Sequence, residues 1–146
     1  MISSLSLLLI ILYGAIILYF TLFSDRMGRM DPYQTYRYNL HPFTEILRFM
    51  TYRHQVSMMA FLINIFGNIL VFAPWGFLIP IWDPKRNHAR YILMYSFSFS
   101  LCIEVLQLFS RVGVFDVDDI IMNTLGGFVG WIIYLIMNYI RKQRRR

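Results

Sequence analysis

The sequence predicts an all-α membrane protein: a bundle of four transmembrane helices with a short interfacial helix in its first outer loop. Hydrophobic residues make up 58% of the 146 residues and charged residues only 15%, with a mean hydropathy of +0.51. A soluble domain carries about a quarter charged residues, so an apolar excess of this size points to lipid as the solvent. The length suits one domain, and we expect a single membrane domain over residues 1–146.

Four apolar stretches have the length of about 20 residues that a helix needs to cross a bilayer. The predicted spans are 2–23, 58–82, 91–109 and 120–140. No basic segment precedes the first span, which is also too long for an ordinary signal peptide, so we expect it to remain uncleaved. In the fourth span Gly126 and Gly130 form a GxxxG pair, which predicts close approach of a neighbouring helix.

The segment between the first two spans has its own helical pattern. Phe43, Ile46, Leu47 and Met50 recur at the spacing of one helix face. This pattern predicts a short amphipathic helix on the outer membrane surface. A re-entrant or collapsed loop is the alternative.

Lysine and arginine in the loops predict the orientation. Eight basic residues lie in two short segments beside helix ends, 83–90 and the tail 141–146. The opposite side has six, spread over the longer loops 24–57 and 110–119. We therefore expect both termini in the cytoplasm. A basic tail directly after an apolar helix favours contact with anionic membrane lipids, and no nucleic-acid partner is expected.

Glu104 is the acidic residue that lies inside a predicted span, roughly 7 to 8 Å below the outer boundary. A charge at that depth is costly, so it is a functional candidate by default. Gln107 and Arg111 share its helix face if the helix continues through Ser110, which predicts that Arg111 neutralises Glu104. The alternatives are a Glu–Arg pair that fixes helix packing and a site that moves a proton or holds a cation or hydroxyl-rich ligand.

Three aspartates, Asp116, Asp118 and Asp119, precede the fourth span. One of them is enough to cap the helix and complement its dipole. Because carboxylates are preferred by Mg²⁺ and Ca²⁺, the three are also candidate ligands of a divalent cation, although their spacing matches no specific metal loop. No other cofactor is implied.

Intramembrane amides lie at a similar depth in the second and fourth spans. A lone intramembrane asparagine most often joins helices, but several at one depth predict a polar pocket open to the outer side. The predicted pocket consists of Asn64, Asn68, Glu104, Gln107 and Asn123, with Arg111, Asp116, Asp118 and Asp119 at its rim.

Four strings, in order from about residue 39 to 130, together resemble the VanZ-like family of small bacterial membrane proteins. They are Asn39-Leu40-His41-Pro42-Phe43; Asn68-Ile69-Leu70-Val71-Phe72-Ala73-Pro74-Trp75-Gly76-Phe77; Glu104-Val105-Leu106-Gln107 with Arg111; and Asp116-Val117-Asp118-Asp119 with Asn123 and Gly126-Gly127. The resemblance implies a multi-pass protein of the bacterial plasma membrane. The family's founding member is associated with resistance to teicoplanin, a glycopeptide with an acyl chain that acts on cell-wall precursors. The resemblance adds Asn39 to the candidate ligand-binding residues.

Three functions remain open from the sequence. The first is a cell-envelope protein whose outward-facing pocket binds a lipid head group, a lipid-linked wall precursor or a lipoglycopeptide, and contributes to teicoplanin-type resistance. The second is an intramembrane enzyme that modifies an envelope lipid, with Glu104 as general acid/base and Asp119 or Asp116 as second carboxylate or metal ligand. The third is a channel or transporter, which the gathering of polar residues near one side disfavours.

Overall fold

The computed structural model describes residues 4–23, 36–52, 57–111 and 113–145. Within these ranges four helices are long and apolar enough to cross a membrane, which confirms the predicted fold class. They are α1 (Ser4–Phe23), α3 (Met58–Trp82), α4 (Ala89–Ser110) and α5 (Val117–Gln143). The shorter elements are β1 (Tyr38–Asn39), α2 (Thr44–Thr51), the 3-10 turn η2 (Pro84–Arg86) and β2 (Phe115–Asp116).

The helix ends differ from the prediction mainly in α4 and α5. The second predicted span has the bounds of α3, and α4 is longer than its predicted span by two residues at the start and one at the end. Helix α5 begins three residues before the predicted start because the Asp116 carboxylate caps it, accepting the Asp118 N–H at 2.8 Å. It also continues to Gln143, so part of the predicted basic tail is helical.

The short helix predicted over 43–50 is present as α2. Phe43 is not part of it, because this residue adopts the left-handed conformation (φ 66°) directly before the first turn. Leu47 and Met50 are exposed on its outer side, whereas Phe49 stacks on Phe61 of α3 with ring centroids 4.2 Å apart. Its position at the membrane surface stays a prediction.

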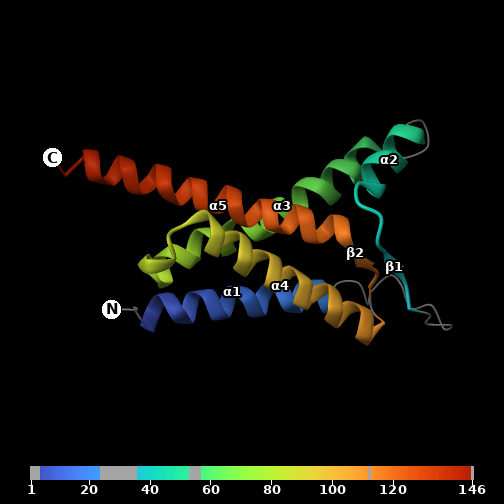
Figure 1. Cartoon of the computed structure of the whole chain (residues 1–146), viewed down its shortest axis with the longest axis horizontal. Coiled ribbons are helices and arrows are strands. Elements are labelled where there is room, and N and C mark those ends of the chain that lie inside the picture. Colours follow the sequence, from blue (N-terminus) through green and yellow to red (C-terminus); the bar gives the residue numbers. More distant parts are fainter. Residues whose placement is uncertain (1–3, 24–35, 53–56, 112, 146) are drawn as a thin grey trace.

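The long helices alternate in direction along the bundle (Figure 1). Both labelled termini lie at one end, together with the turn between α3 and α4. Elements α2, β1 and β2 lie at the other end. This agrees with the predicted separation of the loops into two sides. The assignment of the end with the termini to the cytoplasm stays a prediction.

Glycines bring α3 and α5 into close contact. A Cβ atom added to Gly126 would lie 2.5 Å from the carbonyl oxygen of Ile69, and one added to Gly130 would overlap the carbonyl oxygen of Ala73. Only residues without a side chain allow two helix backbones to approach this closely. The GxxxG pair therefore packs α5 on α3, as predicted.

Two small apolar clusters join α1 to the rest of the bundle. One contains Ile10, Ile79 and Ile92, and the other contains Ile17, Phe72 and Ile103. Many other large apolar side chains of the long helices are exposed. In a bilayer this apolar outer surface contacts lipid chains, so its exposure carries no hydrophobic cost.

The two short strands tie the first outer loop to the start of α5. They pair in parallel, with Tyr38 opposite Phe115 and Asn39 opposite Asp116. The Phe115 N–H also donates to the Arg37 carbonyl oxygen at 3.1 Å. This pairing fixes Asn39 beside the first turn of α5, where the polar residues of the predicted pocket gather.

Candidate functional site

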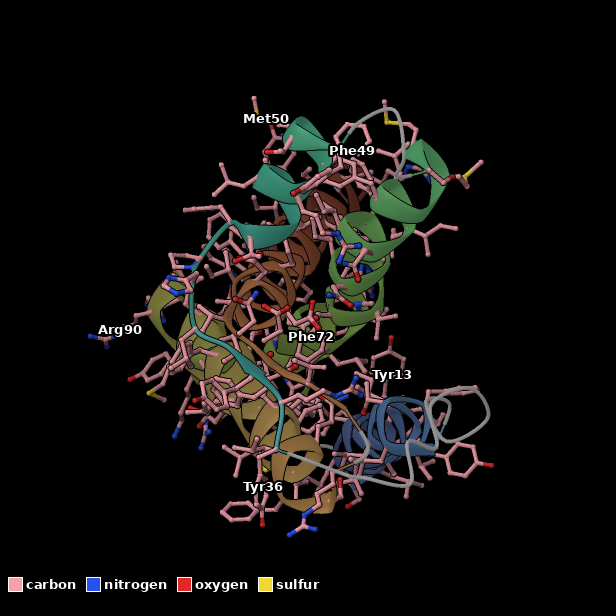
Figure 2. The ribbon with its side chains drawn as sticks, turned by 90° about the vertical axis from the view of Figure 1, so that its right-hand side faces the viewer. Tyr13, Tyr36, Phe49, Met50, Phe72 and Arg90 are labelled. Atoms are coloured by element: carbon pink, nitrogen blue, oxygen red, sulfur yellow. The ribbon has the colours of Figure 1, made fainter. Side chains whose placement is uncertain are left out.

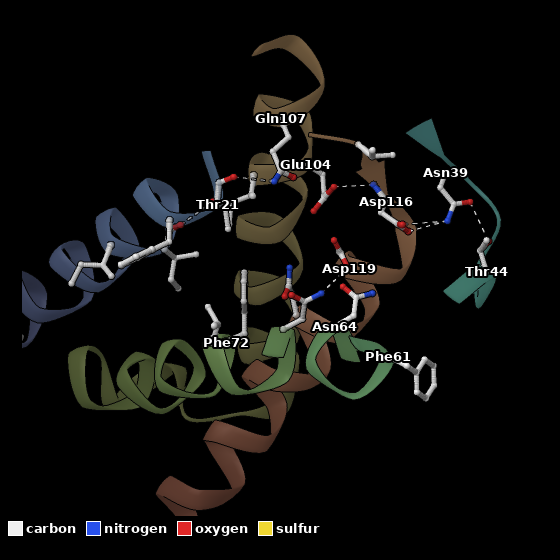
Figure 3. A pocket seen from close by; sticks show the side chains of 18 of the residues that line it. Thr21, Asn39, Thr44, Phe61, Asn64, Phe72, Glu104, Gln107, Asp116 and Asp119 are labelled. Carbon is white, nitrogen blue, oxygen red and sulfur yellow. Dashed lines mark hydrogen bonds between the residues drawn. The ribbon is translucent and has the colours of Figure 1, made fainter. Parts of the chain in front are cut away.

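A cavity of about 860 Å³ lies at the end of the bundle that carries α2, β1 and β2. Figure 3 shows it from close by, with lining side chains from all four long helices and from β1, α2 and β2. It is lined by Tyr13, Ile16, Ile17, Phe20, Thr21, Asn39, Thr44, Arg48, Phe49, Phe61, Asn64, Asn68, Val71, Phe72, Ile103, Glu104, Gln107, Val114, Asp116, Asp119 and Asn123.

Glu104 of α4 contributes the most deeply buried carboxylate of the cavity lining. Its side chain is 2% exposed, and its Oε2 accepts the backbone N–H of Asp116 at 2.8 Å (Figure 3). Asp119, in the first turn of α5, is close enough to interact electrostatically with it. The start of α5 therefore brings two aspartates to the buried glutamate, which sequence spacing alone could only suggest.

Two asparagines from other elements hold these aspartates. Asn68 of α3 donates to Asp119 Oδ1 at 2.6 Å. Asn39 of β1 donates to both carboxylate oxygens of Asp116, at 3.2 and 3.3 Å. The Asn39 side-chain oxygen in turn accepts the Thr44 hydroxyl at 3.1 Å, which links α2 to the same network.

Gln107 and Asn123 make hydrogen bonds to neighbouring helices at the edge of the cavity. Gln107 Nε2 donates to the carbonyl oxygen of Thr21 in α1 at 3.3 Å. Asn123 Nδ2 donates to Ser100 Oγ of α4 at 2.9 Å, and both side chains are buried. These two contacts tie α1 and α5 to α4. Asn64 also lines the cavity, at its exposed side.

Apolar side chains form another part of the cavity lining. They include Ile16, Ile17 and Phe20 of α1 and Val71 and Phe72 of α3. Figure 2 looks at the molecule from the cavity end and shows Tyr13 and Phe72 where α1 and α3 face each other.

In this apolar part of the lining the Tyr13 hydroxyl donates to the Val71 carbonyl oxygen at 2.7 Å, which joins α1 to α3. The cavity lining thus combines carboxylates and amides with hydrocarbon side chains.

Arg111 does not lie where the sequence predicted. Helix α4 ends at Ser110, and Arg111 adopts the left-handed conformation (φ 55°), which turns its side chain off the helix face of Glu104. The exposed guanidinium lies 4.6 Å from the ring centroid of Tyr36 and donates to its hydroxyl at 3.2 Å. The predicted neutralisation of Glu104 by Arg111 is therefore wrong. The Asp116 N–H bonds the carboxylate instead.

The three aspartates do not form one ligand set. Asp116 and Asp119 line the cavity, but Asp118 points to the other side of the first turn, where its Oδ1 accepts the backbone N–H of Phe43. Among the described residues there is no group of three or more His, Cys, Asp or Glu side chains arranged to hold a metal ion. Asp118 is thus a contact between α5 and the residue before α2 rather than a rim residue of the cavity.

Sequence reasoning missed several lining residues. Tyr13 and Thr21 come from the first helix, in which no motif was found, and Arg48 was counted only as a loop charge. Ser100, the partner of Asn123, lies one helical turn before Glu104 on the buried face of α4. That four-residue spacing was a usable indication for Ser100. Tyr13 is one of several hydroxyl residues in the first span, so its hydroxyl gives only a weak indication.

Comparison with known proteins agrees with these features. A curated relative, Protein VanZ from Enterococcus faecium, is 30% identical over 82 residues, which cover 53% of this chain and 48% of the relative. The match thus spans about half the length of that relative. No solved structure matches the chain. The family model described as VanZ/LLP1 matches residues 9–138, which include all of α3 and α4, most of α1 and α5, and every residue that lines the cavity. The chain therefore belongs to the VanZ/LLP1 family.

Proposed function

We propose that this protein acts in the bacterial cell envelope by binding an amphiphile in the cavity: a membrane lipid, a lipid-linked wall precursor or a lipoglycopeptide. The supporting observation is the mixed character of the cavity lining. Carboxylates and amides from α3, α4, α5, β1 and β2 line the same space as hydrocarbon side chains from α1 and α3. A polar head group suits the first set, and an acyl chain suits the second.

The size of the cavity agrees with such a ligand. Its volume of about 860 Å³ is near the upper end of the range of about 300–1,000 Å³ for small-molecule pockets. That space exceeds the needs of an inorganic ion. It takes a head group together with the first part of an acyl chain.

A role in resistance to glycopeptides is part of this proposal. The curated relative is named Protein VanZ. The resemblance of the sequence motifs to the VanZ-like family implies an association with teicoplanin resistance. If the cavity faces the outer leaflet, as the loop charges predict, it meets ligands on the side where cell-wall precursors and such antibiotics occur.

The test is lipid occupancy combined with antibiotic sensitivity for Glu104→Gln. Glutamine keeps an oxygen for the Asp116 N–H, so the variant is expected to insert and fold normally. Native mass spectrometry should show fewer co-purified lipids, and teicoplanin sensitivity should change in a strain that carries the variant. Asp83→Asn, the same chemical change in the turn beyond the far end of α3, is the matched control. Unchanged occupancy and unchanged sensitivity for Glu104→Gln would count against binding in the cavity.

Catalysis on the bound lipid is the second candidate function. Glu104 and Asp119 lie close together in the cavity lining, and two carboxylates at one site suit acid/base chemistry. A product of altered mass, formed from envelope lipids by wild type and lost in Glu104→Gln and Asp119→Asn, would establish turnover. Loss of that product with a chelator would add a divalent cation to the site. No product with any tested lipid or cation would leave binding alone.

A further inference from the structure

Most of the amide groups that line the cavity already donate a hydrogen bond to another group of the protein. Five amides line the cavity within the described residues: Asn39, Asn64, Asn68, Gln107 and Asn123. Four of these donate to protein acceptors, namely the carboxylates of Asp116 and Asp119, the Thr21 carbonyl oxygen and the Ser100 hydroxyl. An amide has two N–H donors and one oxygen, so these contacts leave the lining richer in acceptors than in donors.

The charges of the lining point in the same direction. Among the described lining residues there are three carboxylates, those of Glu104, Asp116 and Asp119. The same lining includes one guanidinium, that of Arg48. Arg111, the second cation expected near Glu104, lies outside the cavity against Tyr36. A cavity with this balance repels a phosphate and attracts a positive charge.

Glu104 shows where such a ligand would bind. Glu104 is only 2% exposed, yet its side chain lines the cavity. Oε2 is bonded to the Asp116 N–H, whereas no hydrogen bond to Oε1 is found within the described part of the chain. Because Glu104 lines the cavity, Oε1 is an acceptor to which a donor in the cavity could bind.

We propose that the cavity selects an amphiphile whose head group donates hydrogen bonds, an ammonium group in particular, over one that carries only phosphate. This inference depends on the proposed function of the cavity. The ammonium group would donate to Glu104 Oε1 and lie near Asp119, and the acyl chain would lie along Ile16, Phe20 and Val71 between α1 and α3. Charge-assisted hydrogen bonds of this kind are about twice as strong as neutral ones.

The test uses three photoreactive amphiphiles that share one dodecyl chain with one diazirine and differ only in the head group: an amine, a glucoside and a phosphate. Each is titrated into phosphatidylcholine nanodiscs that contain the full chain. Crosslinked residues are mapped by mass spectrometry. The crosslinking yield of each amphiphile is divided by the concentration of that amphiphile in the bilayer. The expected order at α1 and α3 is amine, glucoside, phosphate, with the amine about tenfold or more above the phosphate.

Variants assign the preference to the carboxylates. Glu104→Gln and Asp119→Asn should each reduce the advantage of the amine over the phosphate by about tenfold, because each replaces a carboxyl group by an amide and retains an oxygen. Arg48→Gln should leave that advantage unchanged or larger. The ranking in the wild-type protein requires no variant, so the inference remains testable if one of them fails to fold.

Each contrary outcome has a separate meaning. Crosslinks at the cavity with equal yield for all three head groups would overturn the head-group inference and leave the proposed function intact. A phosphate preference that Arg48→Gln removes would overturn it as well. A glucoside yield equal to that of the amine would overturn the preference for charge. Absence of cavity crosslinks for every amphiphile would refute the proposed function itself.

Discussion

Gly126→Ala is expected to destabilise the protein by forcing α3 and α5 apart. The added methyl carbon would lie 2.5 Å from the Ile69 carbonyl oxygen and 2.8 Å from its Cα, whereas ordinary contacts begin near 3.4 Å. Both atoms belong to the α3 backbone, so no side-chain rotation relieves the overlap. Overpacking of this kind typically costs about 1–3 kcal/mol.

Gly67→Ala on α3 is the matched control. It is the same substitution within a membrane helix, but a Cβ atom at Gly67 meets nothing within 4 Å. The exchange of glycine for alanine by itself favours a helix by up to about 1 kcal/mol. The control should therefore be as stable as the wild-type protein or slightly more stable.

The assay is thermal unfolding in detergent, followed by the fluorescence of the three tryptophans. Gly126→Ala should lower Tm by several degrees, since 1 kcal/mol corresponds to about 2–4 °C for a chain of this size. Because Asn68 precedes Ile69 and bonds Asp119 at 2.6 Å, lipid occupancy should fall as well. Equal Tm values for the two variants would refute the close helix contact and the reasoning built on it.

Three further predictions test the N-cap of α5, the hydrogen bond between Trp131 and Asn87, and the orientation of the protein in the membrane. Asp116→Ala should cost about 0.5–2 kcal/mol in unfolding free energy, because it removes the N-cap of α5, and Asp116→Asn should restore most of the loss. Trp131→Phe should cost about 0.5–1.5 kcal/mol, since the indole N–H donates to Asn87 Oδ1 at 2.7 Å. In a chain without its native cysteine, an impermeant thiol reagent added to intact cells should label Leu40→Cys, whereas Lys85→Cys should react only after permeabilisation.

Each of these predictions has a clear contrary result. Equal unfolding free energies for the alanine and asparagine variants at position 116 would show that the cap does not stabilise α5. If the Trp131→Phe protein is as stable as wild type, the hydrogen bond between Trp131 and Asn87 does not contribute to the unfolding free energy. Labelling of position 85 in intact cells would invert the orientation and move the cavity to the inner leaflet.

The number and type of the long helices could be predicted because lipid imposes a length and a composition on any helix that crosses it. A close helix contact at α5 was also predictable from Gly126 and Gly130, but the sequence did not identify α3 as the partner. Helix ends were less certain. The start of α5 depends on one carboxylate oxygen of Asp116, and three aspartates in four residues left several choices of cap.

The site itself could be predicted only in part, because its geometry depends on contacts between distant segments. Asn39 and Asp116 are 77 residues apart, and only the pairing of β1 with β2 brings them together. The error at Arg111 has a local cause. Its left-handed conformation is uncommon for any residue but glycine, and sequence periodicity assumes a regular helix up to the end.

The structure also gives two of the intramembrane polar residues different surroundings. Asn123 bonds Ser100 in a buried contact between α5 and α4, as expected of a residue that joins helices. Glu104 differs, because one of its oxygens bonds the protein and its side chain lines a cavity that also has hydrocarbon in its lining. These surroundings agree with a packing role for Asn123, and they are the reason for which we propose ligand binding at Glu104.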